Sequence, residues 1–306
     1  MTLRIAYLCM ESVFSVQPLE ALLAAGHDVR FVLRPIGPLS SRAESVLRRH
    51  RGFDLAMRKL LGLSEHEHRT NPLAVAADKD IPAWLCGDVN TPMVRKLLER
   101  ERVDLIVISF FNQLLKKSTF EAVPLGAINL HPSLLPHHRG PAPLFWTFKD
   151  GDDVSGLTFH RIAPGEDDGA VLLALPLPLS VETSGEDLVD ELAALAGEHI
   201  VDVVQRVQDG FRGTEQNAAL ATRAPRPGAA DVVIDASQSA QRTFQFARGV
   251  GRWNTLVAHA FGEELRVLDA IDFGGTRRLP GEHALIGDDL LLAAADGVVR
   301  LRIRRL

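Results

Sequence analysis

Apolar runs of strand length alternate with helical patterns at the start of the chain. Leu3–Met10 and Asp28–Leu33 are such runs, and between them Val16–Ala25 carries apolar residues at helical spacing, followed by Gly26. A glycine at this position is typical of a helix C-terminus. Strand, helix and strand in this order form a βαβ unit. The unit predicts a parallel sheet, because parallel neighbours need a crossover connection.

A polar, arginine-rich stretch from Arg34 to Asn71, with one helical pattern at Asp54–Leu61, interrupts this alternation. The alternation then resumes and continues to Val207. The predicted helices are Pro72–Ala77, Thr91–Arg102, Ala142–Lys149 and a long helix to Val207 that Ser184 is expected to cap. The predicted strands are Pro82–Cys86, Asp104–Phe110, Ala127–His131, Gly156–Ile162 and Val171–Leu179.

The pattern changes after residue 208. Asp209–Ala230 has no periodicity and is rich in glycine and proline, which predicts a linker. Val232–Asp235 is the first of several short strands, and Leu290–Ala294 and Val298–Ile303 are joined by a hairpin signal. We therefore expect a doubly wound, Rossmann-like α/β domain at residues 1–208, the linker at 209–230, and a small, OB-like C-terminal β-barrel domain at 231–306.

The composition is that of an ordinary soluble globular protein, with 46% hydrophobic and 24% charged residues. The net charge of -5 gives no general attraction to nucleic acid, so such a partner would have to bind a local basic patch. Cys9 and Cys86 lack metal-site spacing and suit buried thiols in a reducing compartment. With no signal segment and no membrane-length apolar run, we expect a cytoplasmic protein without a membrane partner.

Candidate chemistry is concentrated where one predicted strand ends. Asn129 and His131 lie two residues apart, so on an extended backbone both side chains point to the same side. An amide and an imidazole side by side can bind and protonate a carbonyl oxygen. Pro132 and Pro136 then force the chain out of regular structure and bracket Ser133-Leu134-Leu135 in a fixed loop. This combination indicates a site.

A second polar cluster, Asp167-Asp168-Gly169, follows the next predicted strand. An acidic pair beside glycine is usually a solvated turn. However, strand ends in open α/β sheets converge on one crevice, so a carboxylate from this turn could orient His131 and favour its charged form. Arg139 either binds an anionic group or ties down the proline-bracketed loop through hydrogen bonds to carbonyl groups.

Other motifs exclude common alternatives. The first strand enters its helix through Cys9–Phe14 without a glycine, so a dinucleotide site is not expected there. His160, on a predicted strand, is interpreted as a structural histidine, and no metal site is expected.

The polar motifs together resemble the methionyl-tRNA formyltransferase family. They are Asn129-Leu-His131-Pro-Ser-Leu-Leu-Pro, Arg139-Gly140, Gly151-Asp152, Gly156-x-Thr158-x-His160 and Asp167-x-Gly169. The resemblance covers essentially the whole chain. It implies a 10-formyltetrahydrofolate-dependent formyltransferase, with Asn129, His131 and Asp167 as catalytic residues and a primary amine as acceptor.

The same resemblance implies where the folate donor binds, with the pterin against the Phe110–Leu115 segment and the stretch before Asp167. The folate-binding residues expected on this basis are Phe110, Phe111, Leu114, Leu115, Ser133, Leu134, Leu135, Pro136 and Ile162.

Two kinds of amine acceptor remain open. Pro132, His138 and the Gly251–Thr255 run, where the tRNA enzymes carry Pro-Trp-Pro-Gly-Ala, favour a small amine such as an amino sugar or a hydroxylated amino acid. The arginine-rich stretch slightly favours initiator methionyl-tRNA, because a basic loop at this position grips tRNA in the family. The acceptor-binding residues expected are Arg48, Arg49, Arg51 and Arg139.

Two further classes of function are compatible with the pattern. A hydrolase would split the same formyl donor with water, but the retained C-terminal domain argues against it. A non-catalytic folate- or RNA-binding protein would have no need to keep all three polar residues of the catalytic set.

Overall fold

The structure is a computed structural model that describes residues 2–36, 46–49, 69–275, 279 and 281–305. Its internal contacts divide the chain into two units. The first unit is Met1–Arg139, Gly156–Pro176 and Val189–Thr222; the second is Gly140–Ser155, Leu177–Leu188 and Arg223–Leu306. The chain therefore passes between the units more than once, whereas the predicted boundaries cut it only around residues 209–230. Those boundaries stay a prediction.

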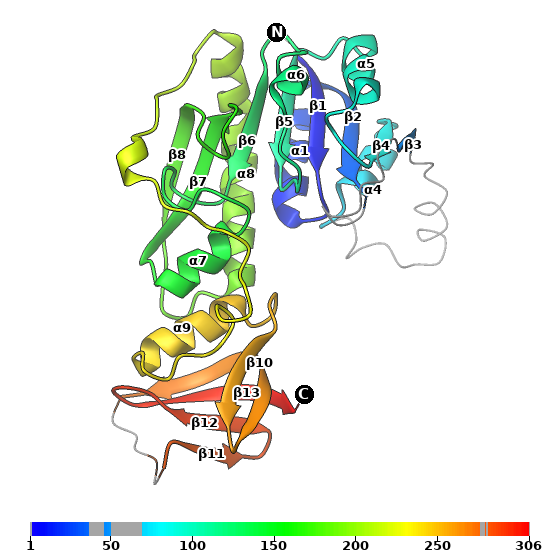
Figure 1. Ribbon diagram of the computed structural model, residues 1–306. Coiled ribbons are helices and arrows are strands. Elements are labelled where there is room, and N and C mark those ends of the chain that lie inside the picture. The colour runs from blue at the N-terminus through cyan, green and yellow to red at the C-terminus, as the bar shows by residue number, and fades with distance from the viewer. Residues whose placement is uncertain (1, 37–45, 50–68, 276–278, 280, 306) are drawn as a thin grey trace. The chain divides into compact units, whose positions relative to one another are not determined.

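Among the described residues, an eight-stranded sheet in the order β3-β4-β2-β1-β5-β6-β7-β8 forms the centre of the first unit (Figure 1). The strands are β1 (Arg4–Cys9), β2 (Asp28–Pro35), β3 (Leu47–Arg49), β4 (Ala83–Cys86), β5 (Leu105–Ser109), β6 (Ala127–His131), β7 (Val154–Arg161) and β8 (Val171–Pro178). The five strands from β4 to β6 are parallel, as the βαβ pattern predicted. β3 and β7 run antiparallel to their neighbours β4 and β6.

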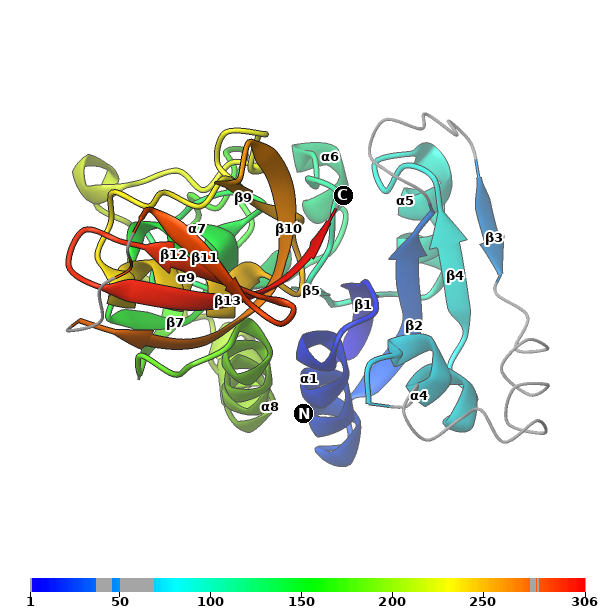
Figure 2. The same cartoon turned by 90° about the horizontal axis from the view of Figure 1, so that it is seen from below.

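Helices cover both faces of this sheet, so the fold is doubly wound (Figure 2). One face carries α1 (Val13–Ala24), α4 (Pro72–Asp78) and α8 (Gly185–Gln208), and the other carries α5 (Pro92–Arg100) and α6 (Lys117–Phe120). Side-chain oxygens cap the helices: Ser12 accepts from Phe14 N, and Ser184 accepts from Asp187 N. Each cap satisfies a backbone N–H group that the helix itself leaves without a partner.

The core next to the candidate site lies between α5 and the sheet. Val94, Leu97 and Leu98 come from one face of α5 and pack with sheet residues such as Phe31 and Ile106, all of them buried. Burying one such side chain contributes about 1.5–3 kcal/mol. Phe111 and Ile162, two of the expected folate-binding residues, pack against the edge of this cluster.

The second unit contains α7 (Pro143–Asp150), α9 (Ala240–Val250) and a five-stranded antiparallel sheet in the order β11-β12-β13-β10-β9. Its strands are β9 (Leu256–Ala260), β10 (Glu263–Gly274), β11 (His283–Ile286), β12 (Asp289–Ala293) and β13 (Val298–Arg305). The turn between β9 and β10 contacts the start of β11, because Phe261 N donates a hydrogen bond of 3.0 Å to His283 Nε2. Helix α7 packs on α9, with the rings of Phe145 and Phe246 at 5.6 Å.

Some local predictions differ from the structure. Val232–Asp235 was predicted as a strand, but it pairs at a single position and forms only an isolated bridge between Val233 and Val257. The short edge strands β3 and β11 were not predicted, since neither has a clear apolar alternation. The helical pattern at Asp54–Leu61 lies outside the described residues. None of the helices in the described ranges combines the length and apolar character that crossing a membrane requires.

Gly156 at the start of β7 permits a close approach that we expect to be essential for stability. A Cβ at this position would overlap the Leu175 carbonyl oxygen and the Leu134 side chain. Gly156→Ala should therefore lower the free energy of unfolding by about 1–3 kcal/mol, the usual cost of overpacking. Gly281→Ala is the control, since no atom lies within 4 Å of a Cβ built there. Denaturant melts that leave both variants at the wild-type midpoint would contradict this account.

Candidate active site

The antiparallel pairing of β6 with β7 brings four polar residues to one side of the sheet. Asn129 lies opposite His160, and His131 lies opposite Thr158. Residues directly opposite each other in an antiparallel pair share a face, and so do residues two apart in a strand. His131, Thr158 and His160 are buried, whereas Asn129 is half-buried. Of these four side chains, the Asn129 amide is therefore the one that a ligand can reach.

Asp167, in the turn between β7 and β8, lies next to both histidines. One of its carboxylate oxygens is 3.6 Å from His131 Nδ1, and the other is 3.6 Å from His160 Nε2. The side chain of Asp167 is only 13% exposed, which limits screening by water. The expectation that Asp167 converges with His131 from a neighbouring strand end is thus confirmed.

The two ring nitrogens of His131 both face oxygen atoms. Nε2 lies 2.9 Å from the His138 carbonyl oxygen, which can only accept a hydrogen bond, and Nδ1 faces the Asp167 carboxylate. A neutral imidazole carries one N–H donor, whereas the imidazolium carries two. The protonated ring of His131 therefore matches its surroundings at both nitrogens.

His160 has the opposite preference. Its Nδ1 must donate to the Arg161 carbonyl oxygen at 2.9 Å, so its Nε2 is an acceptor for the Asn129 side-chain N–H at 3.1 Å. The pKa of His160 is lowered from 6.5 to about 4, chiefly by burial, with Asp167 opposing the shift and His131 adding to it. Neutral His160 thus fixes the orientation of the Asn129 amide and leaves the second N–H of that amide for a ligand.

The loop after β6 is held by Thr158. The Thr158 hydroxyl donates to the Ser133 carbonyl oxygen at 2.7 Å and accepts from Leu135 N at 3.1 Å. Ser133 in turn donates to the His137 carbonyl oxygen at 2.7 Å. Ser133 and Leu135 are buried, whereas Leu134 and Pro136 are half-buried. A folate-binding role for these four residues stays a prediction.

The segment after β5 has features that suit a bound heterocycle. Phe110 and Leu114 are large apolar residues that are 49% and 64% exposed, while Leu115 is buried. Between them, the buried side-chain oxygen of Asn112 has no hydrogen-bond partner within the described part of the chain. An exposed apolar surface beside an acceptor without a partner fits a flat ring that carries N–H donors.

The arginines predicted to bind the acceptor are widely separated. Arg139 donates from Nε and Nη2 to the Gln216 side-chain oxygen, at 3.0 and 2.7 Å. Arg48 and Arg49 are exposed on edge strand β3, which is five strand spacings, or about 24 Å, from β6. Arg51 lies outside the described residues. A small acceptor at His131 therefore cannot reach the β3 arginines.

Sequence reasoning included Thr158 and His160 in a family motif but assigned neither a role in the site. The missed signal is that Asn129 and His131 are two apart on one strand, and Thr158 and His160 are two apart on the next. Two such pairs on neighbouring strands predict a shared polar face. A His on a single strand carries no such information, which explains its interpretation as structural.

His131, His160 and Asp167 also have the spacing of a metal-ligand set, with ligand atoms within 4.8 Å of one another. However, the lone pair of His160 Nε2 already accepts the Asn129 hydrogen bond. A metal at this position would have to break the contact that orients Asn129. The expectation of a metal-free site stays a prediction.

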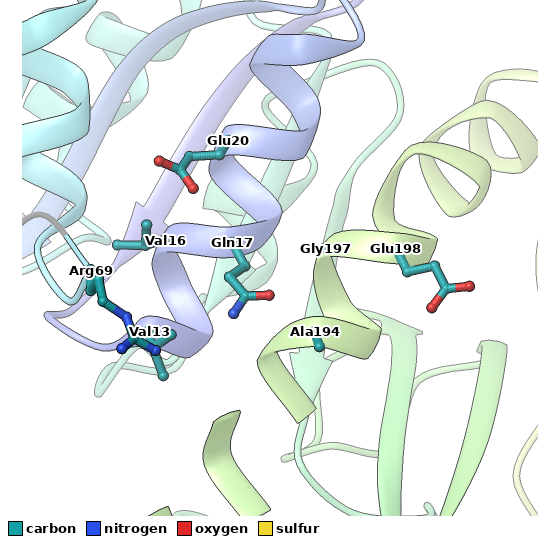
Figure 3. Close-up of a pocket in the computed structure, with 8 residues that line it drawn as sticks. All are labelled: Val13, Val16, Gln17, Glu20, Arg69, Ala194, Gly197 and Glu198. Atoms are coloured by element: carbon teal, nitrogen blue, oxygen red, sulfur yellow. The ribbon is translucent and has the colours of Figure 1, made fainter. Parts of the chain in front are cut away.

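A pocket of about 490 Å³ lies between α1 and α8 in the same unit (Figure 3). Gln17 and Glu20 line it from α1, and Gly197 and Glu198 line it from α8. Arg69, at its margin, forms an ion pair of 3.8 Å with Asp190. None of the predicted site residues lines this pocket, and it lies along helix sides rather than at strand ends.

Comparisons with known proteins identify a family and several similar sequences. The family described as formyl transferase matches residues 56–204. A methionyl-tRNA formyltransferase of Desulfotalea psychrophila is 32% identical over 223 residues, covering 72% of this chain and 69% of that protein. Another, of Koribacter versatilis, is 30% identical over 288 residues, covering 92% of this chain and 84% of that protein.

Solved structures of the same fold are more distant in sequence. WlaRD, a sugar 3N-formyl transferase crystallised in the presence of dTDP and 5-N-formyl-THF, matches with a TM-score of 0.68 and 14% identity over 100% of this chain and 98% of its own. HypX from Aquifex aeolicus in complex with tetrahydrofolic acid matches with a TM-score of 0.64 and 16% identity. The match covers 100% of this chain but 44% of HypX. These likenesses support the fold alone.

The buried, neutral His160 should make stability depend on pH in a defined window. In the unfolded chain His160 takes up a proton near pH 6.5, but in the folded chain only near pH 4. Between these pH values the unfolded state therefore binds more protons than the folded state. The contribution of neutral His160 to the free energy of unfolding is complete above pH 6.5 and is lost as the pH falls toward 4. When the pH is lowered from 7.5 to 5, the free energy of unfolding of the wild type should fall by about 2 kcal/mol more than that of His160→Gln. Denaturant melts would contradict a neutral His160 in the folded protein if the difference in unfolding free energy between wild type and His160→Gln did not change with pH.

Proposed function

The chain belongs to the formyl transferase family, and we propose that it transfers a formyl group from 10-formyltetrahydrofolate to a primary amine. The observation that carries the proposal is the convergence of Asn129, His131 and Asp167 at one strand end, with the Asp167 carboxylate 3.6 Å from His131 Nδ1. Formyl transfer needs donors for a carbonyl oxygen and a group that moves a proton, and this set contains both.

Asn129 and His131 would stabilise the charge that develops on the formyl oxygen. The amine nitrogen attacks the formyl carbon, the C=O bond opens, and its electron pair moves onto the oxygen. The free N–H of Asn129 then donates to this oxyanion. Protonated His131, whose two ring nitrogens face the His138 carbonyl oxygen and Asp167, stabilises the oxyanion through its positive charge. One such donor is worth about 2.7–4 kcal/mol of transition-state stabilisation.

Asp167 would support His131 and assist the proton transfer. The attacking amine must lose one proton, and N10 of the folate must gain one when its bond to the formyl carbon breaks. The carboxylate, directly or through water, can accept the first proton and return it to N10. The products are the formylated amine and tetrahydrofolate, so atoms and charge balance.

The fit of the folate donor rests on the segment after β5. Exposed Phe110 and Leu114 offer apolar surface to the pterin, and the Asn112 side-chain oxygen offers an acceptor for its N–H groups. When bound, the donor supplies an activated formyl group on a nitrogen leaving group. The ligands named for the HypX and WlaRD structures, tetrahydrofolic acid and 5-N-formyl-THF, are consistent with this class of donor.

For the acceptor we favour methionyl-tRNA. The relatives above that cover most of this chain carry that activity in their names. Exposed Arg48 and Arg49 on β3 are also too far from His131 to serve a small amine, but a polynucleotide could contact them while its end lies in the site.

A small amine is the second candidate acceptor. His138 is buried in the loop, and its carbonyl oxygen faces His131, so the departure from the tRNA enzymes at this position lies in the site itself. The fold likeness to the sugar formyl transferase WlaRD is compatible with such an acceptor. Release of formate without any amine would instead indicate the hydrolase.

The catalytic assignment makes a kinetic prediction. His131→Ala and Asn129→Ala should each reduce kcat by about 100-fold or more, because the first removes a positive charge beside the transition-state oxyanion and the second removes a hydrogen-bond donor to it. The dissociation constant for the folate donor should hardly change, since this charge is absent from the ground state. His137→Ala is the control, because its exposed side chain lies on the same loop. If the variants lose affinity for the folate donor as strongly as they lose kcat, Asn129 and His131 are binding residues instead.

The acceptor assignment makes a prediction about salt. Methionyl-tRNA binding should weaken steeply as salt rises, because phosphate contacts release counterions. Arg48→Ala combined with Arg49→Ala should reduce the slope of log K against log salt by about 1–2. The control is Lys96→Ala with Arg206→Ala, which removes the same charge from other exposed positions. If methionyl-tRNA is inert and an amino sugar is formylated at a salt-insensitive rate, the acceptor is a small amine.

A further inference from the structure

The segment that follows α8 returns to the candidate active site. This return segment (residues 214–222) lies within the stretch predicted as a linker. It begins with a two-way backbone bridge between Thr214 and Val171, both hydrogen bonds being 2.8 Å. It ends at Thr222, the last residue of the first unit. The return segment thus belongs to the same unit as Asn129, His131 and Asp167.

Gln216 in the return segment connects to the Asp167 turn. Its side-chain N–H groups donate to the carbonyl oxygens of Asp167 and Gly169, at 2.9 and 2.7 Å. Its side-chain oxygen accepts both hydrogen bonds from Arg139. All the polar atoms of the Gln216 amide are therefore engaged, and the network joins the loop after β6 to the turn that carries Asp167.

The backbone at Asp167 requires such support. Asp167 has φ 53°, in the left-handed region that residues other than glycine adopt at a cost. A conformation of this kind costs of order 1–3 kcal/mol and persists only where neighbouring contacts impose it. Two hydrogen bonds from one amide, to the carbonyl groups on either side of residue 168, provide that constraint.

The other end of the return segment holds the His131 side of the site. Thr222 accepts hydrogen bonds from His138 N and Arg139 N, at 2.8 and 3.0 Å, and its own N–H donates to Pro136 O at 3.2 Å. The His138 peptide held in this way supplies the carbonyl oxygen that binds His131 Nε2. The same segment therefore fixes the partners of both His131 nitrogens.

We propose that Gln216 and Arg139 are positioning residues, which hold the Asp167 carboxylate against His131 without contacting the reactants. The inference rests on the proposed function, because it needs Asp167 to act in formyl transfer. It also gives the Arg139 guanidinium a role different from acceptor binding. Loss of the network displaces the carboxylate, and a displacement of about 1 Å at a catalytic group can cost 100-fold in rate.

Two substitutions at Gln216 separate positioning from general stability. Gln216→Leu removes all four hydrogen bonds. Gln216→Glu keeps an acceptor for Arg139 but turns an oxygen toward the carbonyl oxygens of Asp167 and Gly169, so it releases the turn while the contact with Arg139 remains. Both variants should lose about 100-fold in kcat with little change in KM for the folate donor. Asn217→Ala is the control, because it removes only a cap on Ala219 N in the same segment.

A second measurement reports the turn without using activity. Hydrogen exchange of a peptide covering residues 165–170 should accelerate in Gln216→Leu and Gln216→Glu, and remain at the wild-type rate in Asn217→Ala. A Gln216→Glu variant with wild-type kcat and wild-type exchange would overturn the proposal. Rate losses that simply follow the melting temperature across the variants would reduce Gln216 to a structural residue.

Arg139 provides the remaining test. In a positioning network Arg139→Ala lowers kcat, and the double variant with Gln216→Leu is no worse than either single one. If Arg139 binds the acceptor, Arg139→Ala raises the KM for the amine and its effect adds to that of Gln216→Leu. Failure of the proposed function has a distinct result: wild-type protein forms no formylated amine from any acceptor, although the exchange difference persists.

Discussion

The register between β6 and β7 is the constraint on which the site depends. It sets Asn129 opposite His160 and His131 opposite Thr158, and the period of two puts all four on one face. A slip of one residue would turn that set to the other face of the sheet. The loop after β6 secures the register, because Thr158 bonds to Ser133 O and Leu135 N, and these bonds can form only when the strands are aligned.

Different hydrogen-bond partners give the two histidines different chemistry although they share one carboxylate. His160 donates to a backbone carbonyl group and accepts from an amide, so its neutral form is fully satisfied, and burial lowers its pKa to about 4. His131 faces a carbonyl oxygen and the carboxylate, so its charged form is the one that both partners accept. A neutral ring that orients an amide therefore stands beside a charged ring that can serve an oxyanion.

The sequence allowed the parallel sheet, its helices and the convergence of Asp167 with His131 to be predicted, because each is encoded locally. Apolar runs define β1, β5 and β6, Ser and Thr caps define helix starts, and strand ends share a crevice. His160 and Gln216 could not be found in this way. Their roles depend on a partner far along the chain, and a segment without periodicity, such as residues 214–222, is interpreted as a linker from sequence alone.

The chemistry of the formyl donor is easier to assign than the acceptor, because the two depend on different parts of the first unit. Asn129, His131 and Asp167 lie within a few ångströms and are held by β6, β7 and the return segment, so changes elsewhere leave their chemistry intact. Arg48 and Arg49, which we propose contact the acceptor, lie on the edge strand β3. A surface of this kind can change its charge without displacing Asp167 from His131. Relatives can thus share formyl transfer and differ in the amine they use.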